Sequence, residues 1–228
     1  MMAAVAQPRL SEAIENYAKS IYALARRGDG TVTTNALAER VGVSAGSVSS
    51  MVKKLAERGL VEHEPYRAVQ LTAEGRRVAL SVLRHHRLLE LYLAEHLGVP
   101  WDRVHEEAEA LEHVISEDLA ARIAAKLGHP THDPLGDPIP DAALVIDEGQ
   151  TRSLAEMDIG ERGRFVRVSD TDPEMLRYLD GRGIALGDEL EVVAREPFDG
   201  PLTVRFGSED HVFGGGLTRA MRFDVTTR

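Results

Sequence analysis

Residues 44–59, SAGSVSSMVKKLAERG, decide the fold of the N-terminal third of this chain. Ser44 can cap a helix, because its hydroxyl can accept a hydrogen bond from a backbone amide of the first turn. Val48, Met51, Val52 and Leu55 then form one apolar helix face, and Gly59 suits the left-handed residue that ends a helix. The stretch therefore predicts a helix with a buried stripe and a polar, Ser-rich outer face.

The segments on either side of this helix complete a recognisable pattern. Helical periodicity begins at Ser11, and a short second helix is expected over 34–41, which Thr34 can cap and Gly42 can end. Two short extended runs follow the Ser-rich helix, and a turn at 65–67 joins them into a predicted hairpin. Helix, tight turn, helix and hairpin in this order are typical of a winged helix-turn-helix, with the hairpin as the wing.

The outer face of the predicted third helix has side chains suited to reading DNA. Small hydroxyl groups allow close approach to base edges, and lysines reach phosphates. The residues predicted to contact DNA are Ser44, Ala45, Ser47, Ser49, Ser50, Lys53 and Lys54, with Arg67 at the tip of the wing. The alternative is a purely structural role, because Ser-rich helix starts also occur simply as caps.

Composition limits the class of protein. The 228 residues are 43% hydrophobic and 28% charged, as in ordinary soluble globular proteins. No apolar run is long enough to span a membrane, and the first ten residues are too weakly apolar for a signal peptide. The absence of cysteine excludes disulfides, thiolate metal ligands and a thiol nucleophile. We therefore expect a cytoplasmic protein that has no membrane partner.

The net charge of −10 is distributed unevenly along the chain. Residues 1–77 hold eleven basic and eight acidic side chains, whereas the remainder holds sixteen basic and twenty-nine acidic ones. A mildly basic head on an acidic body suits a protein that offers only one end to phosphates.

A second stretch, HEEAEALEH over residues 105–113, carries imidazoles and carboxylates at helical spacing, and HRLLE over 86–90 adds one more pair. On a helix, four of these residues fall within an arc of about 100°, namely His105, Glu109, Glu112 and His113. Such ligands suit borderline and hard divalent cations, so the sequence predicts a metal site. The candidate ligands are His86, Glu90, His105, Glu109, Glu112 and His113. Taken alone, a His/Glu pair four residues apart is more often a surface ion pair.

The rest of the chain divides into a helical part and a β part. Helices are expected over 72–97, 101–113 and 116–127, with enough apolar surface for a dimer interface. A segment over 128–140 is rich in Pro and Gly and marks a boundary. Short alternating runs over 164–168, 189–194, 202–206, 211–213 and 221–225, with a helix over 173–181, then predict a small β-barrel.

Taken together, the winged helix, the His/Glu-bearing helices, the segment DPLGDPIP over 133–140 and the small barrel resemble the diphtheria-toxin-repressor family of metal-dependent transcriptional regulators. The family includes iron-dependent and manganese-dependent repressors, and the resemblance covers nearly the whole chain. It implies a mainly α fold with a small β part. The implied domains are a DNA-binding winged helix-turn-helix over 1–77, a helical dimerisation and metal-binding domain over 78–141, a linker over 142–150 and an SH3-like β-barrel over 151–228.

The resemblance also implies a first metal site at Glu112, His113, Glu109 and Asn16. Iron sensors of the family place Cys at the position of Glu109, whereas manganese sensors place Glu, so the ligand set favours Mn(II). At the position of Asn16, iron sensors usually have Met and manganese sensors Asp, so a neutral amide is a departure that should lower affinity. Lys19 stands where a binuclear manganese regulator has Glu, which disfavours a second metal beside the first.

A second family site is implied at His86, Glu90 and His105, completed in some members by the barrel. The barrel positions that ligate in iron sensors align near Arg164 and Arg167, which cannot bind a cation. Three acidic residues are possible substitutes, and the sequence leaves the choice open. They are Asp170, Asp172 and Glu174.

The function predicted on this basis is a homodimeric repressor of metal-uptake genes that binds a palindromic operator when a metal bridges Asn16 and the Glu109/Glu112/His113 helix. Mn(II) is the predicted cofactor, Fe(II) is the main alternative, and Zn(II) or Co(II), which are expected to bind in vitro, stay open as other metals that the regulator could sense. No enzymatic activity and no organic substrate are predicted. Three rivals stay open: a regulator that senses an organic ligand, a structural role with the barrel binding proteins, and a metal-dependent hydrolase. The hydrolase lacks the spacing of zinc proteases and leaves the winged helix unexplained.

Overall fold

The structure is a computed structural model that describes residues 10–27, 32–62, 68–169, 172–198 and 200–226. The chain forms two compact units. The first contains Met1–His85, Glu112–Ile115 and Ala142–Leu144, and the second contains His86–Leu111, Ser116–Asp141 and Val145–Arg228. Within the described ranges, no helix combines the length and the apolar character needed to cross a membrane.

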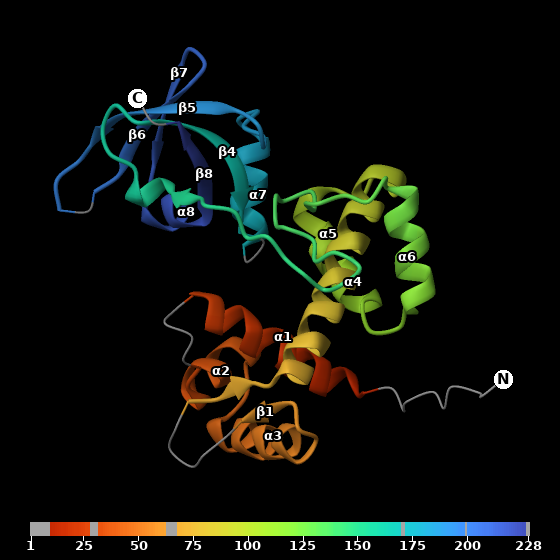
Figure 1. Cartoon of the computed structure of the whole chain (residues 1–228). Coiled ribbons are helices and arrows are strands. Elements are labelled where there is room, and N and C mark those ends of the chain that lie inside the picture. The colour runs from red at the N-terminus through yellow and green to blue at the C-terminus, as the bar shows by residue number, and fades with distance from the viewer. Residues whose placement is uncertain (1–9, 28–31, 63–67, 170–171, 199, 227–228) are drawn as a thin grey trace. The chain divides into compact units, whose positions relative to one another are not determined.

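The first unit is built from three helices, a two-stranded wing and the start of a long helix (Figure 1). Its elements are α1 (Glu12–Arg27), α2 (Thr34–Val41), α3 (Ala45–Glu57), β1 (Val61–Glu62), β2 (Gln70–Leu71) and α4 (Ala73–Leu97), of which α4 continues into the second unit. The wing is antiparallel, with Val61 opposite Leu71. The predicted helix-turn-helix and hairpin are therefore present, and the turn over 65–67, with Arg67, lies outside the described residues.

Local capping explains where α2 and α3 begin and end. Ser44 accepts a hydrogen bond from the Ser47 amide at 3.2 Å, as a capping serine should. The cap of α2 is Thr33 rather than the predicted Thr34, because the Thr33 hydroxyl reaches the Ala36 amide. Gly42 ends α2 in the left-handed region at φ 72°, a conformation that costs glycine no steric strain.

The core of this unit joins all three helices to the wing. Of the predicted stripe of α3, Val48, Val52 and Leu55 are fully buried, whereas Met51 is only partly buried at the edge of the same cluster. The stripe packs against Ile21 of α1, Leu37 of α2 and wing residues in one continuous cluster. Because α1 contributes to this cluster, a displacement of α1 is transmitted to α3.

In the second unit, helical segments are followed by a β-sheet domain. The helices are the end of α4, α5 (Trp101–Leu111) and α6 (Glu117–Lys126), which Ser116 caps as predicted. The predicted continuation of α5 to His113 is wrong, since Glu112 and His113 lie in a turn beyond the helix end. Their positions therefore do not follow from a helical projection.

The sheet has six antiparallel strands in the order β3-β8-β4-β5-β6-β7. The elements are β3 (Arg152–Ser153), η1 (Leu154–Glu156), β4 (Arg162–Val168), α7 (Pro173–Asp180), β5 (Glu189–Arg195), β6 (Leu202–Phe206), β7 (Glu209–Phe213), α8 (Gly215–Ala220) and β8 (Met221–Thr226). Alternation along β4 to β8 buries one face, where Phe165, Phe213 and Phe223 are almost completely enclosed. The sequence did not predict β3, η1 or α8, which lie beside one another (Figure 1).

The Pro-rich segment before the barrel packs onto it. Leu135 is buried in the barrel core, and its carbonyl accepts a hydrogen bond from the Val168 amide of β4 at 3.0 Å. Gly136 has φ 83°, and a Cβ there would lie 1.9 Å from the Val166 carbonyl oxygen, so this close approach requires glycine. The segment thus belongs structurally with the sheet in the second unit.

Candidate metal centres and DNA-binding surface

Three ligand-type atoms converge where α1 meets the turn after α5, inside the first unit. His113 Nε2 lies 2.9 Å from Asn16 Oδ1 and 3.2 Å from Glu112 Oε1. Adjacent ligands around one ion with bonds of about 2.1 Å are about 3 Å apart, so these separations suit a shared cation. Glu112 and His113 are almost completely buried. We call Asn16, Glu112 and His113 the α1 site.

Two further residues of α1 contact the same pair. Lys19 Nζ donates to Glu112 Oε1 at 2.5 Å, and His113 Nδ1 lies 2.6 Å from Glu15 Oε2. A carboxylate on the far nitrogen of a ligating histidine fixes the ring and increases its basicity. Glu15 was not predicted. The signal that could have found it is its place beside Asn16, one turn before Lys19.

The donor set of the α1 site fits a divalent cation of hard or borderline character, because it offers two oxygens and an imidazole. Glu109, which the resemblance adds to this site, belongs to the second unit. There its Oε1 lies 3.6 Å from His105 Nε2. Its place in the α1 site therefore stays a prediction.

A second cluster joins α4 to α5 in the second unit. Glu90 Oε1 lies 2.9 Å from His86 Nε2 and 3.2 Å from His105 Nδ1, and the two histidine nitrogens are 3.1 Å apart. Among the described residues, these three form a group of His, Asp or Glu side chains close enough to hold one ion. We call His86, Glu90 and His105 the α4–α5 site.

Electrostatics keep the central carboxylate of the α4–α5 site ionised. Burial opposes the charge on Glu90, but the charges of His86 and His105 and their hydrogen bonds outweigh it and hold the pKa of Glu90 at about 2. An ionised carboxylate between two imidazoles is ready to accept a metal without first losing a proton of its own.

The α4–α5 site is connected to the barrel by a chain of charges that the sequence did not reveal. Arg87 donates to Asp137 Oδ1 at 3.2 Å, and Arg167 of β4 lies 3.3 Å from the same oxygen. Arg87 also donates to the Pro138 carbonyl. Arg167 thus forms a structural ion pair here.

Of the three acidic residues considered as substitute ligands, Asp172 has another partner and Asp170 is not described. Asp172 caps α7 by accepting a hydrogen bond from the Glu174 amide at 2.9 Å. Arg164 lies 3.7 Å from Asp224. Asp170 lies outside the described residues. A barrel-derived ligand therefore stays a prediction.

The negative charge of Glu90 in the α4–α5 site also acts on Asp133, in the Pro-rich segment before the barrel. Burial, and then the charges of Glu90 and Asp137, raise the pKa of Asp133 well above its ordinary value, although Arg87 opposes them. The carboxyl also accepts hydrogen bonds from the amides of Leu135 and Asp137, each at 2.9 Å. The carboxyl that binds these two amides of the Pro-rich segment is therefore one whose pKa depends on the charge of Glu90.

The predicted DNA-contacting residues of α3 all lie on its exposed side. Three of their hydroxyls are also used within the helix: the Ser44 and Ser47 oxygens are 2.9 Å apart, and Ser49 donates to the Ala45 carbonyl at 2.9 Å. Lys53 and Lys54 are exposed at the end of the same face. The capping and DNA-binding interpretations are therefore compatible, since a capped helix still presents its outer surface.

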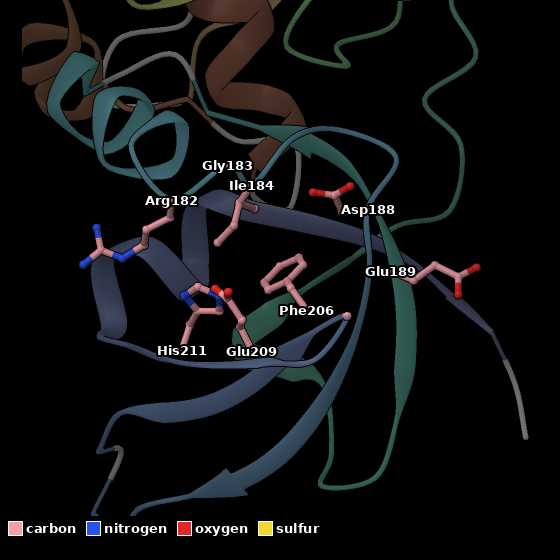
Figure 2. Close-up of a pocket in the computed structure, with 9 residues that line it drawn as sticks. Arg182, Gly183, Ile184, Asp188, Glu189, Phe206, Glu209 and His211 are labelled. Atoms are coloured by element: carbon pink, nitrogen blue, oxygen red, sulfur yellow. The ribbon is translucent and has the colours of Figure 1, made fainter.

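The barrel has a hollow of its own, about 400 Å³ in volume, at the turn between β6 and β7. Figure 2 shows Phe206 and His211 side by side in it, with their ring centroids 5.8 Å apart. Arg182 and Glu189 stand on opposite sides and point outward (Figure 2). The hollow is lined by both apolar and charged groups, and no residue of either candidate metal site lines it.

Three domain families match this chain along its length. Residues 9–69 match the N-terminal DNA-binding domain of iron dependent repressors, and residues 72–141 match their metal-binding and dimerisation domain. Residues 152–215 match the FeoA domain.

Complete proteins match as well. The chain is 34% identical over 194 residues to the diphtheria toxin repressor of Corynebacterium efficiens, covering 81% of this chain and 84% of that one. It is 40% identical over 146 residues to the iron-dependent repressor IdeR of Mycobacterium leprae, covering 64% and 63%. A solved manganese-dependent transcriptional repressor in complex with manganese is 44% identical, with a TM-score of 0.87 over 92% of this chain and 98% of that one.

Proposed function

The chain belongs to the diphtheria-toxin-repressor family of metal-dependent transcriptional regulators, and we propose that it represses metal-uptake genes when it binds Mn(II). Members of this family are DNA-binding repressors and not enzymes, as the sequence predicted for this chain. The remaining questions are which metal acts, where it binds and how it controls the DNA-binding head.

The observation that carries the proposal is the convergence of Asn16, Glu112 and His113 inside one unit. Asn16 is on α1, which packs in the core that positions α3, whereas Glu112 and His113 follow α5. A cation held by all three would tie the DNA-binding head to the dimerisation region. The cation would contribute only its attraction for the three ligand atoms, and the protein would determine where those atoms lie.

Metal and operator are then coupled. When the metal fixes α1 to the turn after α5, α3 is also restrained, because α1 and α3 share one core. DNA binding then has to immobilise less of the protein, so it costs less conformational entropy in the metal-loaded form. Couplings of this kind are typically about 1–3 kcal/mol, and by linkage DNA raises metal affinity by the same factor.

Mn(II) is favoured by the ligand types. The α1 site offers an amide oxygen, a carboxylate and an imidazole, and the proposed fourth ligand, Glu109, is a further carboxylate. No thiolate exists anywhere in the chain. The similar manganese-dependent repressor supports this choice, whereas the identity to iron-dependent repressors keeps Fe(II) as the second candidate.

The DNA-binding part of the proposal is a homodimer on a palindromic operator. Two copies of α3 related by a two-fold axis would read half-sites about one helical turn apart. The seven predicted contact residues, from the cap Ser44 to Lys54, would face the base edges and phosphates, and Arg67 of the wing is proposed to reach the backbone.

The test measures operator binding by fluorescence anisotropy, with a palindrome selected from a random pool by the manganese-loaded protein. We expect binding with Mn(II) and a loss of at least tenfold in affinity with chelator. The Asn16→Ala variant should bind DNA weakly in both conditions. Equal affinity of the wild-type protein with Mn(II) and with chelator would sink the metal switch, and activation by anaerobic Fe(II) but not by Mn(II) would transfer the proposal to iron.

A further inference from the structure

The α1 site already contains a cation supplied by the protein. The Lys19 ammonium lies 2.5 Å from Glu112 Oε1, the same oxygen that lies 3.2 Å from His113 Nε2. Building on the proposed function, we infer that Lys19 is a resident counter-ion which an incoming metal must displace from Glu112. Lys19 thereby sets the metal concentration at which the repressor becomes active.

Burial explains why Glu112 needs this partner. Its side chain is only 1% exposed, whereas that of Lys19 is 16% exposed. A buried carboxylate without a partner costs several kcal/mol, so the metal-free protein needs a positive group at this place. Lys19 reaches it from α1, and the ammonium at the end of a flexible stem can withdraw toward solvent when another cation arrives.

The charges around the site determine the sign of the effect on metal affinity. Glu112 and Glu15 are the two carboxylates that contact the site, and Lys19 cancels one of them. A divalent ion at the converging ligand atoms would meet the ammonium at close range, where two cations repel strongly in a poorly solvated site. Lys19 and the neutral Asn16 therefore act in the same direction, because both reduce the negative charge available to the metal.

A different role for Lys19 predicts the opposite sign. If Lys19 kept its hydrogen bond to Glu112 in the metal-loaded protein and merely oriented the carboxylate, then removing it would weaken metal binding. The two roles are therefore separated by the direction in which affinity changes, and not only by its size.

The experiment uses the full chain in a His86→Ala background, so that titration calorimetry and the electron paramagnetic resonance signal of free Mn(II) report the α1 site alone. The variants are Lys19→Gln, Lys19→Met and Lys19→Arg. Lys126→Gln is the matched control, because it removes the same charge from an exposed position at the end of α6. Thermal unfolding of each metal-free variant is the second readout.

We expect Lys19→Gln and Lys19→Met to bind Mn(II) at least tenfold more tightly than the parent protein. Their metal-free forms should melt at lower temperature, and Mn(II) should raise the melting temperature by more than it does in the parent. Lys19→Arg, which keeps the charge, and Lys126→Gln should both stay within about twofold of the parent. If either neutral variant folds only when Mn(II) is present, the metal has replaced the ammonium, which supports the inference.

Unchanged or weaker Mn(II) binding by the neutral variants would overturn the inference while leaving the proposed function intact. A failure of the proposed function looks different: Asn16→Ala would then have the same Mn(II) isotherm as the parent, because the metal would not be held by α1 at all.

Discussion

The two candidate metal sites use the same chemical groups but differ in how the chain assembles them. In the α4–α5 site, Glu90 contacts His86 four residues earlier and His105 fifteen residues later, so the three side chains pair with one another. In the α1 site, His113 contacts Asn16 across 97 residues, and Lys19 and Glu15 serve as additional partners. The first arrangement braces two neighbouring helices, whereas the second joins the DNA-binding head to a distant turn.

The difference suggests a division of labour. A metal in the α4–α5 site adds charge to a cluster that is already internally paired, so we expect it to stabilise the second unit. A metal in the α1 site competes with the ion pair between Lys19 and Glu112 and fixes α1 to the turn after α5. We therefore expect it to act as the switch. Each prediction below tests this contrast.

The largest expected effect comes from comparing the two central carboxylates. Glu112→Gln removes a ligand and leaves the Lys19 ammonium without its carboxylate, so Mn(II)-dependent operator affinity should fall at least 100-fold, or about 3 kcal/mol. Glu90→Gln should lower it less than tenfold. Anisotropy titrations in excess Mn(II) measure both. Equal losses in the two variants would remove the distinction between switch and brace.

The α4–α5 site should dominate the acid sensitivity of the metal-free protein. The pKa of Glu90 is about 2 in the folded chain and 4.5 ordinarily, so its ionisation stabilises the fold above pH 4.5 and the stabilisation is lost as the pH falls toward 2. Between pH 5.5 and 3 the wild-type protein should lose about 2 kcal/mol more than Glu90→Gln. Urea unfolding in chelator measures this, and parallel losses in the two proteins would contradict it.

The sequence predicted what is locally determined. The cap at Ser44 and the stripe Val48, Val52 and Leu55 act within one helix, and they appear where the pattern placed them. Five strands of the sheet likewise followed from alternation, whereas β3 is too short to show a periodicity and the glycines before α8 indicated a turn. Short elements such as these depend on neighbours that a local pattern does not contain.

Sequence reasoning failed where distant contacts decide the structure. The end of α5 at Leu111 was missed because a helical pattern continues through Glu112, whose side chain is instead engaged by Lys19, 93 residues away. Glu15 was missed for the same reason, since it acts through a contact with His113, 98 residues away, and the local pattern of α1 showed only that it stands beside Asn16. The clustering of His86 and Glu90 was easier, because four residues on one helix bring them together.

We expect Glu15 to affect metal affinity at the α1 site only through its contact with His113. Glu15→Gln keeps the side-chain size but weakens the hydrogen bond that holds the ring nitrogen Nδ1, so Mn(II) affinity of the α1 site should fall about tenfold. Glu12→Gln, on an exposed part of the first turn of the same helix, is the control for the change in charge. Titration calorimetry in the His86→Ala background resolves the two. If Glu12→Gln weakened binding as much as Glu15→Gln, the effect would be one of overall charge and not of ring position.

The smallest effect is expected where this chain departs from the manganese sensors it resembles. Asn16→Asp replaces a neutral oxygen donor by a carboxylate at 2.9 Å from His113 Nε2, which should raise Mn(II) affinity several-fold. The gain is limited because the new carboxylate can also pair with Lys19, one turn along the same helix, and that pairing must be broken as well. The Asn16→Asp, Lys19→Gln double variant should therefore gain more than the product of the two single gains. Isotherms for the four proteins of this cycle measure the interaction directly, and strictly multiplicative gains would show that Lys19 does not pair with the carboxylate introduced at position 16.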